Sequence, residues 1–266
     1  PPHNEIWYTS TDGEVVKPNS AFFASTKKFG AKIISNTYQD GKGIIKLDGS
    51  VTIIGERAFN DLERLKTVII PDSVTTIENG AFSFSKNIVD VVIPNSVKTI
   101  DNNAFKNCES LQGVIIPPSV SEIGSYAFAN CVNLRTIVIP NSVNTLGKCV
   151  FSGCKSLSYV GMNNRIALIG DYMFSECSQL RSVMLPSTVM SIGDGAFRGC
   201  HGLLNINLPS SVMSIGDLAF NDCVNLRNIT IPQNVSYIGN YAFSGCMSLP
   251  QDIVYKIMLI SRGAVQ

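Results

Sequence analysis

One phenylalanine recurs every 23 residues through most of the chain, and this period constrains the fold more than any other feature. A fixed period of this length is typical of solenoids and arrays, in which each unit packs only on its neighbours. The 266-residue chain is therefore expected to form one elongated body rather than one or two globular domains. The nine copies share one phase without insertion and are Phe59, Phe82, Phe105, Phe128, Phe151, Phe174, Phe197, Phe220 and Phe243.

Other slots of the unit keep the same register when each Phe is counted as position zero. Leu or Ile stands at +6, Val or Ile at +9, and an aliphatic residue or Met at +11. Pro follows at +12 in seven of eight units, with Asn163 as the exception, then Val or Ile at +15 and Ile or Leu at +18. A slot that stays apolar in every copy is expected to face a shared core.

The apolar spacing within one unit predicts its secondary structure. The run from +6 to +11 reads L-x-x-I-x-I, whose alternation and β-branched residues indicate a short strand that Pro ends. Strands from successive units are expected to stack into a parallel sheet at about 4.8 Å per step. A second extended piece is predicted at +14 to +18. Gly at +19 permits a turn, and the x-x-A-F-x-x-C segment indicates one helical or 3₁₀ turn.

Seven of the eight cysteines occupy a single slot, +3, where we expect a ladder of buried free thiols. Leu62 and Ser85 fill the same slot, which indicates that size rather than chemistry selects the residue. Rungs about 5 Å apart would also permit disulfides on distance, and metal binding is a further alternative. The eighth, Cys149, is expected to be exposed. The ladder residues are Cys108, Cys131, Cys154, Cys177, Cys200, Cys223 and Cys246.

Residues 1–43 lie outside the repeat and are predicted to form a β-rich N-terminal cap, the alternative being a small separate binding module. Asp40-Gly41 between strand-like runs is a hairpin signal. The expected strands are Glu5–Ser10, Ala31–Asn36 and Gly43–Leu47, with a turn at Thr11-Asp12-Gly13 leading into Glu14–Lys17. The expected aromatic bulk comes from Trp7, Tyr8, Phe22, Phe23 and Phe29.

The repeat phase predicts a solenoid over residues 44–249, with about nine 23-residue units, followed by a capping helix and tail over 250–266. Ser248 and Gln251 have the spacing of a capping box, and Gly263 is suited to end the helix. Ile253, Ile257 and Ile260 give it one apolar face. A membrane-surface anchor is the alternative, opposed by the presence of only two basic residues, Lys256 and Arg262.

Charge and hydropathy exclude several classes of function. The net charge is +1, so no long-range field attracts nucleic acid or an anionic membrane. No apolar run reaches the roughly 18 residues that a transmembrane helix needs. The chain begins at Pro1 without a signal-peptide pattern, and we expect a processed or trimmed form.

The segment Cys131–Val143, C-V-N-L-R-T-I-V-I-P-N-S-V, resembles the BspA-like leucine-rich repeat family, and the resemblance covers about residues 44–249. It implies a leucine-rich repeat solenoid (α/β and β-dominated), with parallel strands stacked in a curved right-handed coil between terminal caps. It also implies an extracellular or cell-surface, adhesin-like protein that binds a protein or another cell-surface macromolecule. The family carries no catalytic motif and no cofactor.

Two outward-facing columns of the predicted sheet are the candidate partner-binding residues. The +10 column carries a contiguous aliphatic row, and such patches mark partner sites. The alternatives are that strands simply favour β-branched residues or that another segment covers them. The +7 column is basic and suits either an acidic partner or a solvated face. The candidates are Ile69, Val92, Ile115, Val138 and Met184 at +10, Tyr159 at +8, and Lys66, Arg135, Arg181 and Arg227 at +7.

Catalytic residues are sparse. The two histidines are His3 and His201, and a Cys149–His201 pair would have to meet across two units with no third group. No zinc spacing, P-loop or G-x-G-x-x-G element is present. We therefore predict a non-enzymatic binding protein without cofactor or metal. A structural spacer without a soluble ligand and a hydrolase using Cys149 are the alternatives.

Overall fold

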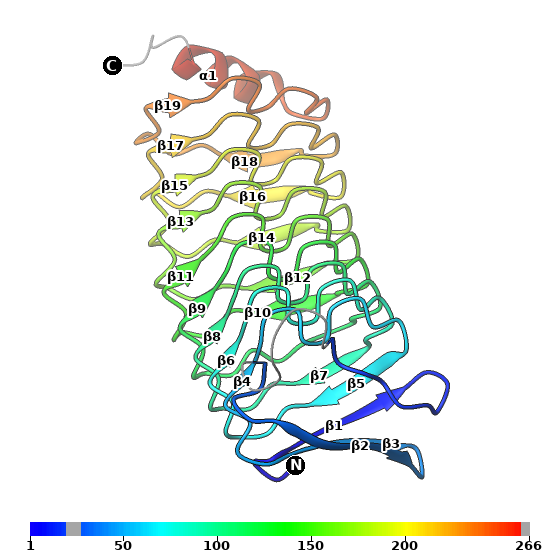
Figure 1. Ribbon diagram of the computed structural model, residues 1–266. Coiled ribbons are helices and arrows are strands. Elements are labelled where there is room, and N and C mark those ends of the chain that lie inside the picture. The colour runs from blue at the N-terminus through cyan, green and yellow to red at the C-terminus, as the bar shows by residue number, and fades with distance from the viewer. Residues whose placement is uncertain (20–27, 262–266) are drawn as a thin grey trace.

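The computed structural model describes residues 1–19 and 28–261 and shows a β-solenoid whose repeated units stack as successive coils (Figure 1). Strands β1 to β3 lie at one end of the stack and helix α1 at the other. Phe22, Phe23 and Gly263 lie outside the described residues.

The +8 to +10 segments form parallel strands on one side of the coil, which we call the sheet face. Pairing joins residues 23 apart, as Val68 with Val91 and Ile206 with Ile229, which confirms the predicted register. Its strands are β5 (Leu65–Ile69), β7 (Asp90–Val92), β10 (Thr136–Val138), β12 (Tyr159–Gly161), β14 (Ser182–Met184), β16 (Asn205–Asn207) and β18 (Asn228–Thr230).

Two-residue strands at +17 and +18 lie within the second extended piece that the sequence predicts, and they pair in parallel into a second sheet. In each strand an outward residue is followed by an inward Ile that is buried in the shared core, or in β11 by Leu146, which is partly buried. These strands are β4 (Ile53–Ile54), β6 (Thr76–Ile77), β8 (Thr99–Ile100), β9 (Glu122–Ile123), β11 (Thr145–Leu146), β13 (Leu168–Ile169), β15 (Ser191–Ile192), β17 (Ser214–Ile215) and β19 (Tyr237–Ile238).

The remaining side of each coil, from about four residues before Phe to three after it, we call the turn side. The predicted helical or 3₁₀ turn is wrong here: consecutive turns replace it, such as those closed by Ala58 N–H to Gly55 and by Asn60 N–H to Arg57. The residues two before and two after each Phe have positive φ, for example Arg57 at 52° and Asp61 at 58°. A left-handed residue on both sides of the Phe prevents a helix from propagating.

The nine repeated Phe rings stack along the interior with centroids 5.1 to 5.8 Å apart and planes within 19° of parallel. Their spacing is close to the separation of neighbouring strands, so ring stacking and backbone pairing act in register. Phe29 from the N-terminal segment packs on Phe59 at 5.7 Å and extends the stack.

The +3 slot holds buried free cysteines, as predicted, but the inference that only size matters there is wrong. Each thiol donates to the carbonyl of the Phe in the preceding coil, as Cys108 does to Phe82 at 3.2 Å. Ser85 donates to the Phe59 carbonyl in the same way. The slot therefore selects a small side chain with a hydrogen-bond donor, and Leu62 is the exception.

The N-terminal strands continue the sheet face instead of covering it from outside. β1 (Glu5–Ser10) pairs antiparallel with both β3 (Lys42–Leu47) and β5, and β2 (Ile33–Gln39) pairs with β3. The predicted hairpin is confirmed, because Asp40 and Gly41 have φ of 51° and 77° between β2 and β3. Because β3 runs across residue 43, the division into a cap at 1–43 stays a proposal.

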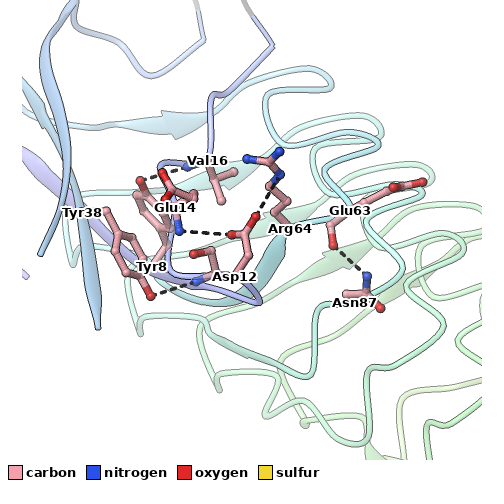
Figure 2. A network of polar contacts seen from close by, with 9 residues as sticks. Tyr8, Asp12, Glu14, Val16, Tyr38, Glu63, Arg64 and Asn87 are labelled. Atoms are coloured by element: carbon pink, nitrogen blue, oxygen red, sulfur yellow. Dashed lines mark hydrogen bonds and ion pairs between the residues drawn. The ribbon is translucent and has the colours of Figure 1, made fainter. Parts of the chain in front are cut away.

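The segment after β1 reaches the first coil through a small polar network (Figure 2). Asp12 accepts a hydrogen bond from the Glu14 N–H at 3.1 Å and forms an ion pair with Arg64 at 3.1 Å. The Tyr8 hydroxyl accepts from the Val16 N–H at 3.2 Å. Arg64 and Asp12 are exposed enough that their pair contributes little, so the β1–β5 pairing carries most of this attachment.

Helix α1 (Gln251–Ser261) follows the last coil and turns its apolar side toward it. Ile260 is buried, and Ile253 and Ile257 are partly buried against the core, as predicted. The predicted capping box is not seen among the described residues, where no hydrogen bond joins Ser248 and Gln251 and the Ser248 hydroxyl donates to the Val224 carbonyl at 2.8 Å.

We predict that Phe151→Ala lowers the free energy of unfolding by about 3–5 kcal/mol, because it leaves a cavity between two stacked rings. Phe243→Ala is the matched control, since Phe243 has one repeated ring neighbour and is only partly buried. Urea unfolding followed by circular dichroism measures both. An equal loss for the two variants would contradict the role of stacking between coils.

The ladder predicts a pH dependence of stability. Burial raises the pKa of the Cys154 thiol from 9.0 to about 12, against the lowering effect of a backbone hydrogen bond. The unfolded chain therefore loses this proton first as pH rises above about 9, and the folded state becomes less stable between pH 9 and 12. Cys154→Ser keeps a donor without a titrating thiol, so its stability should fall less steeply, by about 1.4 kcal/mol per pH unit. Parallel slopes for the two proteins in urea unfolding across this range would reject the assignment.

Candidate functional site

The +10 side chains of the sheet face point to solvent, as strand alternation predicts. Ile115 and Met184 are each 85% exposed and Val138 is 58% exposed, whereas Ile137 and Val183, which precede Val138 and Met184, are buried and Val114 is partly buried. Ile69 is partly buried beside β1. The structure therefore brings the aliphatic +10 residues together in one row, and Gly161 interrupts it before Met184.

Strand β1 extends this row into the N-terminal segment. Trp7 pairs with Ile69 on one side and with Ile44 on the other, and residues paired directly across strands share a face. We call the resulting set of six residues the apolar row. Its members are Ile44, Trp7, Ile69, Val92, Ile115 and Val138.

Trp7 is the member that sequence reasoning missed as a site residue. Its ring lies under the Lys42 ammonium, 3.0 Å from the centroid, and its indole N–H donates to Glu5 at 2.8 Å. Alternation within Glu5–Ser10 signals that Trp7 lies opposite the buried Tyr8. The position of Trp7 beside Ile69 depends on the pairing of β1 with β5, and no sequence pattern indicates that pairing.

The basic +7 residues are exposed but do not form one patch. They lie on separate coils, with Val89, Gln112, Ser158 and Leu204 at the intervening +7 positions. None of the four takes part in an ion pair within the described ranges 1–19 and 28–261. Spaced charges of this kind suit contacts at the margin of an interface rather than a single anion site. The four are Lys66, Arg135, Arg181 and Arg227.

Tyr159 and Met184 lie together at a break in the solenoid. In the described part of the chain, strand pairing stops between β12 and β14 on the sheet face, and between β11 and β13 in the second sheet. On the sheet face it also stops between β7 and β10, where Gly113 forms only an isolated bridge to Thr136. At the break between β12 and β14 the turn side stays connected, with Phe151 N–H donating to Met173 at 3.0 Å. A groove of about 450 Å³ opens on the sheet face between the two strands, lined by Tyr159, Met184 and their neighbours.

Asn163, the one departure from Pro at +12, holds the coil together beside this break. Its amide donates to the Pro140 carbonyl at 2.7 Å and to the Val143 carbonyl at 3.1 Å. In four other coils a Ser or Thr hydroxyl at +14 donates to the equivalent of the Val143 carbonyl, as Ser119 does to Val97. Arg165 occupies +14 here, so the Asn163 amide takes over the missing hydroxyl's bond.

Cys149 is buried at 7% exposure, so the prediction that it is exposed is wrong. Its φ of 55° belongs to the left-handed slot on the turn side, where its N–H donates to Asp171. The neighbouring Cys149 thiol raises the pKa of the Tyr126 hydroxyl. A buried thiol in this position is poorly suited to attack a substrate. His201 is exposed on the surface, as expected.

Among the described residues, no group of three His, Cys, Asp or Glu side chains is placed to hold a metal ion. No helix in that part of the chain combines the length and apolar character needed to cross a bilayer.

Comparison with known proteins agrees with this architecture. The BspA type leucine rich repeat region, in six copies, matches residues 32–158 and 167–256. A leucine rich cell surface protein from Faecalibacterium prausnitzii is 27% identical, with a TM-score of 0.50 over 75% of this chain and 68% of that one. A leucine rich repeat protein from T. pallidum is 27% identical, with a TM-score of 0.47 over 81% and 79%. No curated protein matches the chain.

We predict that Asn163→Ala lowers the free energy of unfolding by about 1–3 kcal/mol, because two carbonyls lose their donor. Asn164→Ala, one residue further along and exposed, should change it by less than about 0.5 kcal/mol. Urea unfolding of the two variants measures the difference. Equal stability of both would show that the Asn163 amide is dispensable.

Proposed function

We propose that this chain, which belongs to the BspA type leucine rich repeat family, is a non-enzymatic cell-surface protein that binds a partner protein through its sheet face. The observation that carries the proposal is the apolar row. Six apolar side chains, five on strands and Ile115 on the coil between β7 and β10, span about 25 Å, a length suited to a protein interface.

The composition of the row suits recognition of a protein. Large apolar side chains, above all Trp, act as anchors in interfaces, and Trp7 lies within the row. The exposed Val92, Ile115 and Val138 form the part that is open to solvent. Contiguous apolar groups of this kind on a soluble protein mark interaction sites. Tyr159 and Met184 at the groove and the separated Lys and Arg residues are proposed as the margin of the same surface.

Cell-surface placement is part of the proposal. It is supported by the similarity to the Faecalibacterium prausnitzii cell surface protein, which has the same repeat architecture. We propose an adhesin-like role, in which the partner is a protein or another macromolecule of a host or neighbouring cell surface.

We predict that the combined change Val92→Asp, Ile115→Asp and Val138→Asp weakens partner binding more than about tenfold, because three charges would have to be desolvated in the interface. Immobilised protein is exposed to extracellular-matrix and cell-surface extracts, and the captured protein is then titrated against the variant. Trp7 is the only Trp in the chain, so its fluorescence should change when that partner binds.

Leu168→Asp and Met213→Asp are the matched controls, because both residues are exposed apolar side chains outside the sheet face. They should leave partner affinity unchanged. Affinity that the triple variant retains would reject the sheet face as the site. If no captured protein distinguishes wild type from the triple variant, the result favours the alternative of a structural spacer.

A further inference from the structure

The turn side of the first three coils carries a polar hollow of about 420 Å³, away from the sheet face. Its volume is within the range of small-molecule sites. Three coils contribute to it, so its lining is assembled by the stacking and not by one loop. The side chains on which the argument depends are Arg57, Asp61, Asn79, Phe84, Asn103 and Lys106.

Phe84 is the unusual member of this lining. It occupies the +2 slot with a φ of 63°, a left-handed conformation that is unfavourable for a bulky residue. Its ring is 42% exposed at the hollow, so core packing does not account for its presence. Strained residues of this kind cluster at ligand sites. The other units carry small or polar residues at +2: Asp61, Asn107, Asn130, Gly153, Glu176, Gly199, Asp222 and Gly245.

The polar groups of the hollow are held in place by bonds between coils. Asn103 donates its amide N–H to the Asn79 side-chain oxygen at 3.2 Å. Gly80 forms part of the lining, and a Cβ there would meet Arg57 Cγ at 3.3 Å, so the missing side chain leaves room for the Arg57 stem. Lys106 is placed by the Tyr126 ring, 5.1 Å from its ammonium.

We infer that this hollow binds a saccharide that carries a carboxylate, such as a uronic acid residue. The C–H face of a pyranose packs on an exposed aromatic ring, which Phe84 supplies. Sugar hydroxyls both donate and accept, as do the amides of Asn79 and Asn103. The Arg57 guanidinium matches a carboxylate in a bidentate pair, and Lys106 adds a second cation against the single anion Asp61.

The test is saturation-transfer NMR with three probes: methyl β-D-glucuronide, methyl β-D-glucoside and AMP. The glucuronide should bind with millimolar affinity, and the neutral glucoside at least about tenfold more weakly. Phe84→Asn should reduce glucuronide affinity at least about tenfold while the melting temperature stays equal or rises, because Asn tolerates this backbone conformation better. Arg57→Gln should abolish the preference for glucuronide over glucoside.

Tyr241→Asn is the matched control, because Tyr241 is an exposed aromatic residue with a φ of 56° in the last coil, away from the hollow. It should leave glucuronide binding unchanged. Equal glucuronide affinity in wild type and Phe84→Asn, tighter binding of AMP, or no saturation transfer to the glucuronide would each overturn the inference. The triple sheet-face variant should bind glucuronide like wild type, so this test is independent of the proposed protein partner.

Discussion

The contact between one coil and the next is the constraint on which the whole structure depends. Each coil donates backbone hydrogen bonds to its neighbour on the turn side, as Phe59 N–H does to Ala81 at 2.7 Å, and most coils also pair strands with a neighbour on the other two sides. The Phe rings stack at the same spacing. One inserted residue would displace every column at once, and this explains why the 23-residue period runs through nine Phe without a shift.

Much of the fold could be predicted from sequence because the repeat samples each slot many times. The strands, the buried thiols and the interior Phe column all follow from side-chain type at a constant spacing. The turn side could not be predicted, since a helical turn and two successive turns place the same apolar residues inward. The helical turn and the successive turns differ in backbone conformation. The left-handed positions hold residues such as Arg57 and Tyr126 instead of glycine, so the sequence does not reveal them.

The candidate site, like the fold, could be predicted only in part from the sequence. Alternation within each strand predicted the exposed Val92, Ile115 and Val138. It could not place Trp7, because the pairing of β1 with β5 joins residues about 60 positions apart that share no repeat. Nor could it predict the break beside Asn163, whose amide occupies the proline slot and makes the bond to the previous coil that a Ser or Thr hydroxyl makes elsewhere.

In a solenoid this regular, residues that depart from the repeat pattern indicate where a local structural or functional constraint acts. Inward slots are restricted by the neighbouring coils, so substitutions there are limited to side chains that fit, as with Ser85 among the cysteines. Outward slots are free to vary, and most of the residues in them have no structural consequence. Phe84 departs from the small or polar residues that fill its +2 slot in the other units, because it places an exposed ring on a left-handed backbone. Exposed rings on left-handed backbone also occur at Tyr126 and Tyr241, so what sets Phe84 apart is its place in the lining of a polar hollow, where a bound saccharide would pack against it.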